Sequence, residues 1–330
     1  MAQSQWLFTL DALYSTPSLV SLEQELHDRA AAIELLFRLG ASLALPTSAM
    51  CTAATWFHRF YMRYSMEDFD PRHVSASCIF LATKTEECGR KLRDVARVAY
   101  AKSHHIDVRD LPADSYDVDC WQSSILITEE TLLEALCFEF VVESPHVEML
   151  NMFESLQPGI ELQEYAWSVT HDAYRTPLCL LYPSRIIAIA CYVLAQRVYD
   201  GPNSPSLDAR IAACSPSKSL PTPPSHKPPS PDASRAAVDY YNLQESETEQ
   251  VAEALAILLE FYSSQNAPHL QFTTWVTPPA RPIQRRPIFI SRDSLPQIEK
   301  HQPRSQDILN RTPNYPDGRH TPASVPSEGK

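Results

Sequence analysis

The sequence predicts an all-α protein that contains two tandem sets of five helices. Apolar residues recur at intervals of three and four through most of the first 200 residues, and no stretch alternates with the period of two that a strand requires. Proline is rare in this region, which holds 8 of the 28 prolines, and most of these stand where a helix should begin. The same order of helices starts again near residue 144.

The first set of helices is expected in residues 22–143. Asp70 followed by Pro71 is typical of a helix start, with a capping side chain before a proline at the first helical position. Thr128, preceded by the apolar Ile127, is expected to cap the fifth helix after a loop that contains five aspartates. The five expected helices cover Leu22–Leu45, Ser48–Tyr64, Pro71 to just before Gly89, Leu92–Lys102 and Thr128–Phe140.

The second set is expected in residues 144–264. In both sets the third helix follows a proline and is rich in small residues, such as Ala76 and Ser77 in one and Ala188 and Ala190 in the other. Small residues let neighbouring helices approach closely, so each third helix should lie at the centre of its set. The expected helices of the second set are Pro145–Leu156, Leu162–Leu180, Pro183–Tyr199, about Ala236–Asn242 and Glu245–Ser263.

Three segments fall outside this pattern. Residues 1–21 form an N-terminal segment, and residues 201–232 are a proline- and serine-rich insertion between the third and fourth helices of the second set. Residues 265–330 form a tail with frequent prolines and no sustained period. Such compositions cannot bury a core, so both the insertion and the tail are expected to be disordered.

Ser-Pro and Thr-Pro steps are frequent in these proline-rich segments. They are the sites that a proline-directed kinase phosphorylates, and they are equally the ordinary composition of a linker; both interpretations stay open. The steps begin at Ser204, Ser215, Thr222, Ser230, Thr277, Thr312 and Thr321.

Charge and composition narrow the class of function. Residues 1–200 hold 15 Lys and Arg against 27 Asp and Glu, a net charge of −12, which disfavours direct binding to nucleic acid. No apolar run approaches the roughly 18 residues of a membrane helix, and no secretory signal is recognisable, so no membrane partner and an intracellular location are expected. The eight cysteines include no C-x-x-C pair and are expected to be reduced.

No catalytic, cofactor-binding or metal site is expected. The six glycines are too dispersed for a phosphate-binding loop, and the G-x-S-x-G and H-E-x-x-H motifs are absent. His104 and His105 are adjacent, so their side chains should diverge. The same holds for the acidic pairs that begin at Glu86 and Glu129. The chain is therefore expected to act by binding rather than by catalysis.

One stripe of residues is unusual for a helix rich in small side chains. Phe80, Lys84 and Glu87 stand at positions i, i+4 and i+7 of the third expected helix, which places them on one face. An aromatic ring, a cation and an anion on one face suit protein recognition. A core phenylalanine beside a solvated Lys–Glu pair explains the same spacing.

The segment Phe80-Leu81-Ala82-Thr83-Lys84-Thr85-Glu86-Glu87 resembles the signature of the cyclin box. The following Arg90–Val95 segment is similar to the transcriptional K, T and L types of cyclin, as is Leu136–Phe140 with the Ser144-Pro145-His146 joint. Within that group the chain resembles the fungal cyclin (beta) subunit of the kinase that phosphorylates the C-terminal domain of RNA polymerase II. The resemblance extends over about residues 22–263.

The resemblance implies a nuclear, non-catalytic subunit that binds and activates a cyclin-dependent protein kinase and promotes transcription elongation. In the family, the lysine matching Lys84 and the glutamate matching Glu129, expected at the start of the fifth helix, hold the kinase. Further kinase contacts are implied at four other positions, and whether a third subunit joins stays open. These positions are Phe80, Glu87, Leu133 and Phe138.

Two other functions would keep the same fold. A cell-cycle cyclin would be favoured by a destruction-box-like signal near the N-terminus, and none is recognisable. A two-repeat basal transcription factor that binds DNA would normally carry a zinc ribbon and basic repeats. The first 200 residues instead carry the net charge of −12.

Overall fold

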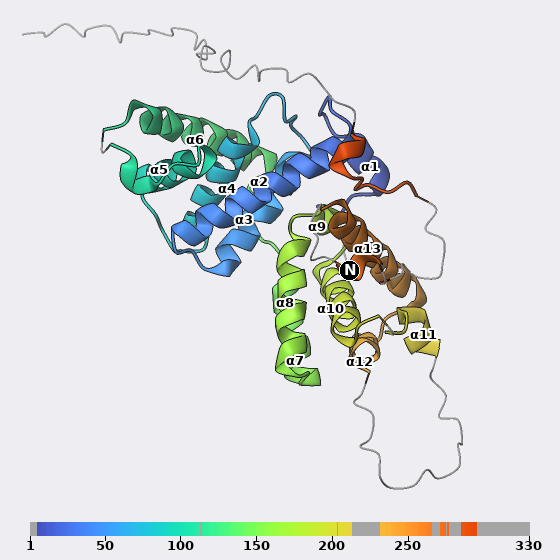
Figure 1. Ribbon diagram of the computed structural model, residues 1–330. Helices are drawn as coiled ribbons and strands as arrows, with labels where there is room; N and C mark the ends of the chain where they lie inside the picture. Colours follow the sequence, from blue (N-terminus) through green and yellow to red (C-terminus); the bar gives the residue numbers. More distant parts are fainter. Residues whose placement is uncertain are drawn as a thin grey trace, which may run out of the picture.

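The protein is all-helical, and no strand occurs in the described residues of the computed structural model (Figure 1). Those residues are 5–112, 114–202, 204–212, 232–265, 271–274, 276 and 285–295. None of their helices combines the length and apolar character needed to cross a bilayer. The α-helices are α1 (Leu10–Tyr14), α2 (Leu22–Ser42), α3 (Thr47–Phe60), α4 (Pro71–Thr85), α5 (Leu92–Ser103), α6 (Tyr116–Ala135), α7 (Pro145–Leu156), α8 (Ile160–Ala173), α9 (Leu178–Leu181), α10 (Ser184–Asp200), α11 (Leu207–Ala212), α12 (Ala233–Tyr240) and α13 (Glu245–Ser264). Short 3₁₀ helices are η1 (Val108–Asp110), η2 (Gln271–Thr274) and η3 (Arg292–Ser294).

Two helices rich in small residues occupy the centres of the two helix groups, as the sequence predicts. Helix α4 packs against α2, α3, α5 and α6, while α10 packs against α7, α8, α12 and α13. Ala76 and Ser77 of α4 and Ala188 and Ala190 of α10 are fully buried. Their small side chains allow close helix–helix approach around most of the circumference.

The predicted start of α4 is confirmed. Asp70 has extended backbone angles, and its side chain accepts a hydrogen bond of 2.8 Å from the backbone N–H of Arg72, while Pro71 occupies the first helical position. Ser144 caps α7 in the same way, accepting from the N–H of His146 at 3.3 Å. Both caps satisfy amides that a helix start leaves unpaired.

The predicted start of the fifth helix at Thr128 is wrong, because α6 already begins at Tyr116. Asp117 and Asp119, which were expected in a loop, lie in the first turn of α6. The positive end of the helix dipole stabilises their negative charges there. Thr128 is buried in the interior of the helix. The sequence in fact contains a buried stripe at helical spacing, which was missed because polar residues are interspersed with it. The stripe consists of Val118, Trp121, Ile125 and Leu132.

The second group also departs from expectation in two places. The single helix expected over 162–180 is divided into α8 and α9, and Pro177 stands just before α9. Within the expected insertion, 201–232, the short helix α11 packs against α12. Residues 213–231 of that insertion lie outside the described residues.

Helix α2 belongs to both hydrophobic cores. Leu22 and Leu26, in its first half, pack into the core formed around α10. Ile33 and Leu36, in its second half, pack into the core formed around α4. One continuous helix therefore fixes the relation between the two groups, and Figure 1 shows it reaching from the first group toward α1 and α13.

A fully buried arginine ties this helix to α3. Arg29 donates through Nε to Glu25 Oε1 at 2.8 Å, and both side chains have no exposed surface. The guanidinium also donates to the carbonyl oxygens of His58, at 3.2 Å, and Tyr61, at 2.8 Å, at the end of α3. His58 in turn donates through Nε2 to the Tyr174 carbonyl oxygen at 2.9 Å, which joins α3 to the turn after α8.

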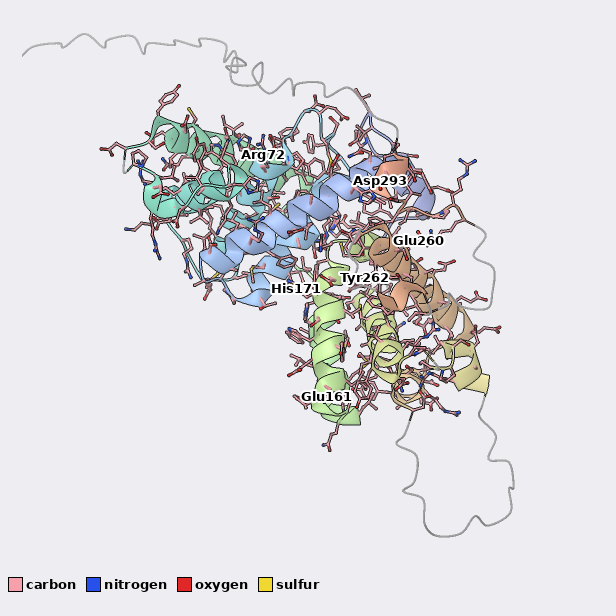
Figure 2. The ribbon with its side chains drawn as sticks, viewed as in Figure 1. Arg72, Glu161, His171, Glu260, Tyr262 and Asp293 are labelled. Carbon is pink, nitrogen blue, oxygen red and sulfur yellow. The ribbon has the colours of Figure 1, made fainter. Side chains whose placement is uncertain are left out.

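A short part of the expected tail packs onto the helices. Ile288 and Phe289 are buried in the core around α10, and the Ile288 N–H donates to Glu260 Oε2 of α13 at 2.8 Å. The carbonyl oxygen of Ile290 accepts from Nε2 of His27, on α2, at 2.7 Å. The side-chain view in Figure 2 shows Glu260 on α13 near the segment that carries Asp293. Residues 285–290 thus connect α13 to α2.

Replacing Phe289 by alanine should lower the free energy of unfolding by about 3 kcal/mol, because it opens a cavity where the tail segment meets the core. Urea unfolding monitored by circular dichroism measures the change. Arg286→Ala, at an exposed position three residues earlier, should change the same quantity by less than about 0.5 kcal/mol. Equal effects of the two variants would contradict the packing of this segment.

Stability should also decrease as the pH falls below about 6.5. Burial, reinforced by the charge of Arg29, lowers the pKa of His58 from 6.5 to about 3. The folded protein therefore keeps His58 neutral at a pH where the unfolded chain binds a proton, which favours unfolding. Between pH 7.5 and 5.5 this residue should remove about 1 kcal/mol from the free energy of unfolding.

The measurement is urea unfolding at both pH values. His58→Gln retains an N–H donor for the Tyr174 carbonyl but does not titrate, so its pH dependence should be shallower than that of the unmodified chain. His105→Gln, at an exposed position, should leave the pH dependence unchanged. An identical slope in the His58→Gln variant would refute the assignment.

Candidate partner-binding surface

Lys84 and Glu129 form a direct ion pair between α4 and α6. Lys84 Nζ donates to Glu129 Oε1 at 2.7 Å and to Oε2 at 2.8 Å. The lysine side chain is 48% exposed, whereas that of the glutamate is 9% exposed. The carboxylate therefore acts as a mostly buried anchor that holds a half-exposed ammonium group at the surface. Lys84 also lies in the last turn of α4, where the negative end of the helix dipole stabilises its positive charge.

The ring of Phe80 supports the same ammonium group from below. Lys84 Nζ lies 4.1 Å from the centre of the Phe80 ring, one helical turn earlier on α4, a geometry that gives a cation–π interaction. Phe80 itself is buried in the core around α4. The recognition and core interpretations of Phe80 are thus compatible, since the ring fills the core and its face contacts the lysine.

Glu87 does not continue the stripe that its spacing predicts, because α4 ends at Thr85. Its φ of 53° is in the left-handed region, and the N–H of Cys88 donates to the carbonyl oxygen of Thr83 at 3.1 Å. This is the hydrogen bond that closes a helix with a left-handed residue, a place usually taken by glycine. Glu87 is exposed at the helix end, off the α4 face that carries Lys84.

Leu133 and Phe138 follow Glu129 toward the C-terminal end of α6. Leu133 is half-buried one turn after Glu129, and its carbonyl oxygen accepts from the N–H of Phe138 at 3.1 Å. Phe138 is 65% exposed. Cys137 and Phe138 both have positive φ, 52° and 57°, so two consecutive non-glycine residues hold a strained turn that presents an aromatic ring to solvent.

One apolar residue of this surface was missed in the sequence analysis. Leu126 is 48% exposed on α6. Leu126 stands three residues before Glu129, and Leu133 four residues after it, so the three share one face of the helix. The spacing is present in the sequence, but a helix start at Thr128 leaves Leu126 outside the helix.

The arrangement suits binding rather than catalysis. The contacts of the pair consist of the ammonium, the carboxylate and the face of the Phe80 ring. The described part of the chain contains no cluster of three His, Cys, Asp or Glu residues that could hold a metal ion. A charged centre that shares a helix face with the apolar Leu126 and Leu133 has the make-up of a protein-binding site.

Comparison with known families identifies the first helix group. Residues 9–141 match the family described as cyclin, N-terminal domain. These residues are a cyclin domain. The match spans α1 to α6 and contains all six residues that the sequence analysis assigned to the partner surface.

Curated cyclins show clear sequence similarity to this chain. Cyclin pch1 of Schizosaccharomyces pombe is 38% identical over 200 residues, which cover 58% of this chain and 57% of pch1. Human cyclin-T2 is 32% identical over 199 residues, which cover 59% of this chain and 27% of cyclin-T2. Rat cyclin-C is 34% identical over 157 residues, which cover 48% of this chain and 56% of cyclin-C. The matched region thus spans little more than half of pch1 and a smaller part of cyclin-T2.

Solved structures extend the fold similarity beyond the first domain. A chain of the yeast RNA polymerase II CTD kinase CTDK-1 complex matches with a TM-score of 0.57 and 17% identity, over 93% of this chain and 88% of that one. A chain of the CAK complex from Chaetomium thermophilum matches with a TM-score of 0.52 and 15% identity, over 83% of this chain and 86% of that one. These matches confirm the cyclin fold that the sequence predicts.

The two members of the ion pair should contribute unequally to stability. Lys84→Ala leaves a mostly buried carboxylate without its partner and should lower the free energy of unfolding by about 2 kcal/mol. Glu129→Gln leaves a half-exposed ammonium that water can solvate and should cost less than about 1 kcal/mol. Urea unfolding of both variants at pH 7.5 measures the difference, and a larger cost for Glu129→Gln would contradict the anchor role of the glutamate.

Proposed function

We propose that this chain is the regulatory subunit of a cyclin-dependent protein kinase and that it binds the kinase through the surface around Lys84 and Glu129. The observation that carries the proposal is the half-exposed ammonium on a mostly buried carboxylate, with the exposed Leu126 on the same face of α6 as that carboxylate. The cyclin domain over residues 9–141 supports it. So do the names of the similar chains, which are cyclins and members of kinase complexes.

The ion pair leaves Lys84 one donor for a partner. An ammonium group has three N–H bonds, and two of them point to the oxygens of Glu129. The third can donate to a backbone carbonyl of the kinase. Glu129 fixes the position of that donor before binding, so less side-chain entropy is lost when the complex forms. Exclusion of water at the interface then strengthens the charge-assisted hydrogen bond.

Activation in this proposal is a population shift. The free kinase exchanges between inactive and active positions of a regulatory helix, and the cyclin surface binds the active position more tightly. Only a surface that keeps its shape can discriminate between the two positions. The packing of α4 and α6 against each other, with Phe80 buried beneath Lys84, supplies such a surface.

The finer part of the proposal concerns the substrate. We propose that the bound kinase phosphorylates the C-terminal domain of RNA polymerase II, promotes transcription elongation and acts in the nucleus. The support is similarity to cyclin pch1 and cyclin-T2, together with the fold match to a chain of a CTD kinase complex. The 15 basic and 27 acidic residues of the first 200 fit a protein partner better than nucleic acid.

Replacing Lys84 and Glu129 together by alanine should weaken kinase binding by at least about 2 kcal/mol, roughly thirtyfold in Kd. Because both charges are removed, no buried carboxylate is left unpaired, and the fold should persist. The kinase is first identified by affinity purification of the unmodified chain and mass spectrometry, which also reveals any third subunit. Its Kd for both forms is then measured by titration calorimetry.

A matched control variant loses one lysine and one glutamate at positions outside the proposed surface. Lys102→Ala with Glu161→Ala changes α5 and α8, away from the proposed surface, and should leave the Kd unchanged within a factor of two. Phosphorylation of a C-terminal-domain peptide by the complex tests the substrate separately. The surface assignment fails if the folded Lys84/Glu129 variant binds the kinase as tightly as the control does.

A further inference from the structure

We propose that Ser204 is a phosphorylation site for a proline-directed kinase and that its phosphate breaks the ion pair between Arg210 and Asp232. This goes beyond the proposed function, because it concerns the second helix group and any kinase that recognises Ser-Pro. The site lies between α10 and α11, at the start of the proline-rich insertion (201–232).

Four Ser-Pro or Thr-Pro steps fall in the described residues, and they differ in what holds the hydroxyl group. Thr176 is fully buried. Thr16 donates to Glu25, and the Ser144 hydroxyl caps α7 and contacts the Tyr174 hydroxyl. Ser204 alone among these four has its hydroxyl oxygen against a cation, accepting from Arg210 Nη2 at 2.8 Å.

Arg210 is the centre of this part of the structure. Its side chain is 3% exposed and pairs with Asp200 at 2.6 Å and with Asp232 at 2.5 Å. Its Nε also donates to the Pro205 carbonyl oxygen at 3.1 Å. One guanidinium therefore joins the end of α10, the Ser-Pro step, α11 and the residue before α12. Two of its partners, Asp200 and Asp232, lie on opposite sides of the insertion in sequence.

Phosphorylation would place a dianion at the hydroxyl oxygen that already accepts from Arg210. In the reaction, Ser204 Oγ forms a bond to the γ-phosphorus of a nucleoside triphosphate, the hydroxyl proton is released, and the nucleoside diphosphate leaves. The product carries about −1.5 to −2 charges and three strong acceptor oxygens. A guanidinium binds phosphate in a bidentate manner, so the phosphate competes directly with the two aspartates.

Asp232 is the partner that should be released. Its Oδ1 already accepts from the backbone N–H of Arg235 at 3.1 Å, as the cap of α12, so it keeps a hydrogen bond and a favourable helix dipole. Asp200 is the last residue of α10, where a carboxylate without a cation would face the negative end of the dipole. Releasing Asp200 is therefore the costlier alternative.

Loss of the Arg210–Asp232 pair should loosen α11 from α12. The two helices pack against each other, and Leu207 of α11 and Ala237 of α12 are both buried in the core around α10. Local opening of such a short helix exposes its backbone amides. The modification would thus change the surface at the base of the insertion while the cyclin domain over residues 9–141 stays intact.

The test uses the full chain with Ser215, Thr222, Ser230, Thr277, Thr312 and Thr321 replaced by alanine, so that Ser204 is kept and the tail sites are removed. In this chain Ser204 is the one Ser-Pro or Thr-Pro site kept in the insertion (201–232) and the tail (265–330). The chain is incubated with a purified proline-directed kinase and magnesium ATP, and peptide mass spectrometry locates the phosphate. Hydrogen–deuterium exchange then compares the two forms. We expect phosphate on Ser204 and at least about tenfold faster exchange of the amides in α11 and α12, with exchange in α4 and α6 unchanged.

Two variants control the interpretation. Ser204→Ala in the same background should take up no phosphate at this peptide. Asp232→Asn keeps a capping oxygen for the Arg235 N–H but loses the charge, so without phosphate it should already show the faster exchange in α11 and α12. Phosphorylating Asp232→Asn should accelerate that exchange by less than about twofold further.

Two results would overturn the proposal. The first is absence of phosphate on Ser204 while the same kinase modifies other Ser-Pro sites of the unmodified chain. The second is a phosphorylated Ser204 with unchanged or slower exchange in α11 and α12. Because the kinase is supplied from outside, neither result depends on whether this chain binds a cyclin-dependent kinase through Lys84 and Glu129.

Discussion

The arrangement of both helix groups depends on one buried cation. Arg29 has no exposed surface and satisfies its donors with Glu25 and with two carbonyl oxygens at the end of α3. An uncompensated charge there would cost several kcal/mol, so α2 and α3 can pack only in the relation that pairs it. Because α2 enters both cores, and His58 of α3 bonds to Tyr174, this single constraint fixes the second group relative to the first.

The position of the proposed partner surface depends on the packing of α2 in the same way. The second half of α2 packs on α4, and the small residues of α4 let α6 approach closely enough for Glu129 to reach Lys84. Burial of Phe80 holds the ring beneath the ammonium group. The exposed charge is thus attached to the most tightly packed helix of its group, which limits how far the surface can move when a partner binds.

Much of this could be predicted from the sequence, and the failures have physical causes. Small residues after a proline marked α4 and α10 as central, because close packing demands them. The predicted start of α6 was too late because a segment rich in Asp and Ser has the composition of a loop. Acidic residues are also common in the first turn of a helix, where the dipole stabilises their charge. Glu87 was placed on α4 because nothing in Glu86-Glu87-Cys88 signals a left-handed helix end, where glycine is usual. The contact of Ile288 and Phe289 with the core is tertiary and has no local signal.

Strained turns at the ends of α4 and α6 add a last argument for the proposed binding surface. Glu87 after α4, and Cys137 with Phe138 after α6, occupy left-handed conformations that non-glycine residues adopt at a cost of about 1 kcal/mol or more each. Folding gains little from the Phe138 ring, which is 65% exposed and makes an edge contact with Phe140 at 6.4 Å, whereas glycine would close the turn at lower cost. One of these turns ends each of the two helices that carry the Lys84–Glu129 pair. In the proposed complex, a partner that covers Phe138 would gain the free energy of burying its ring, and this gain would offset the strain that a glycine turn avoids.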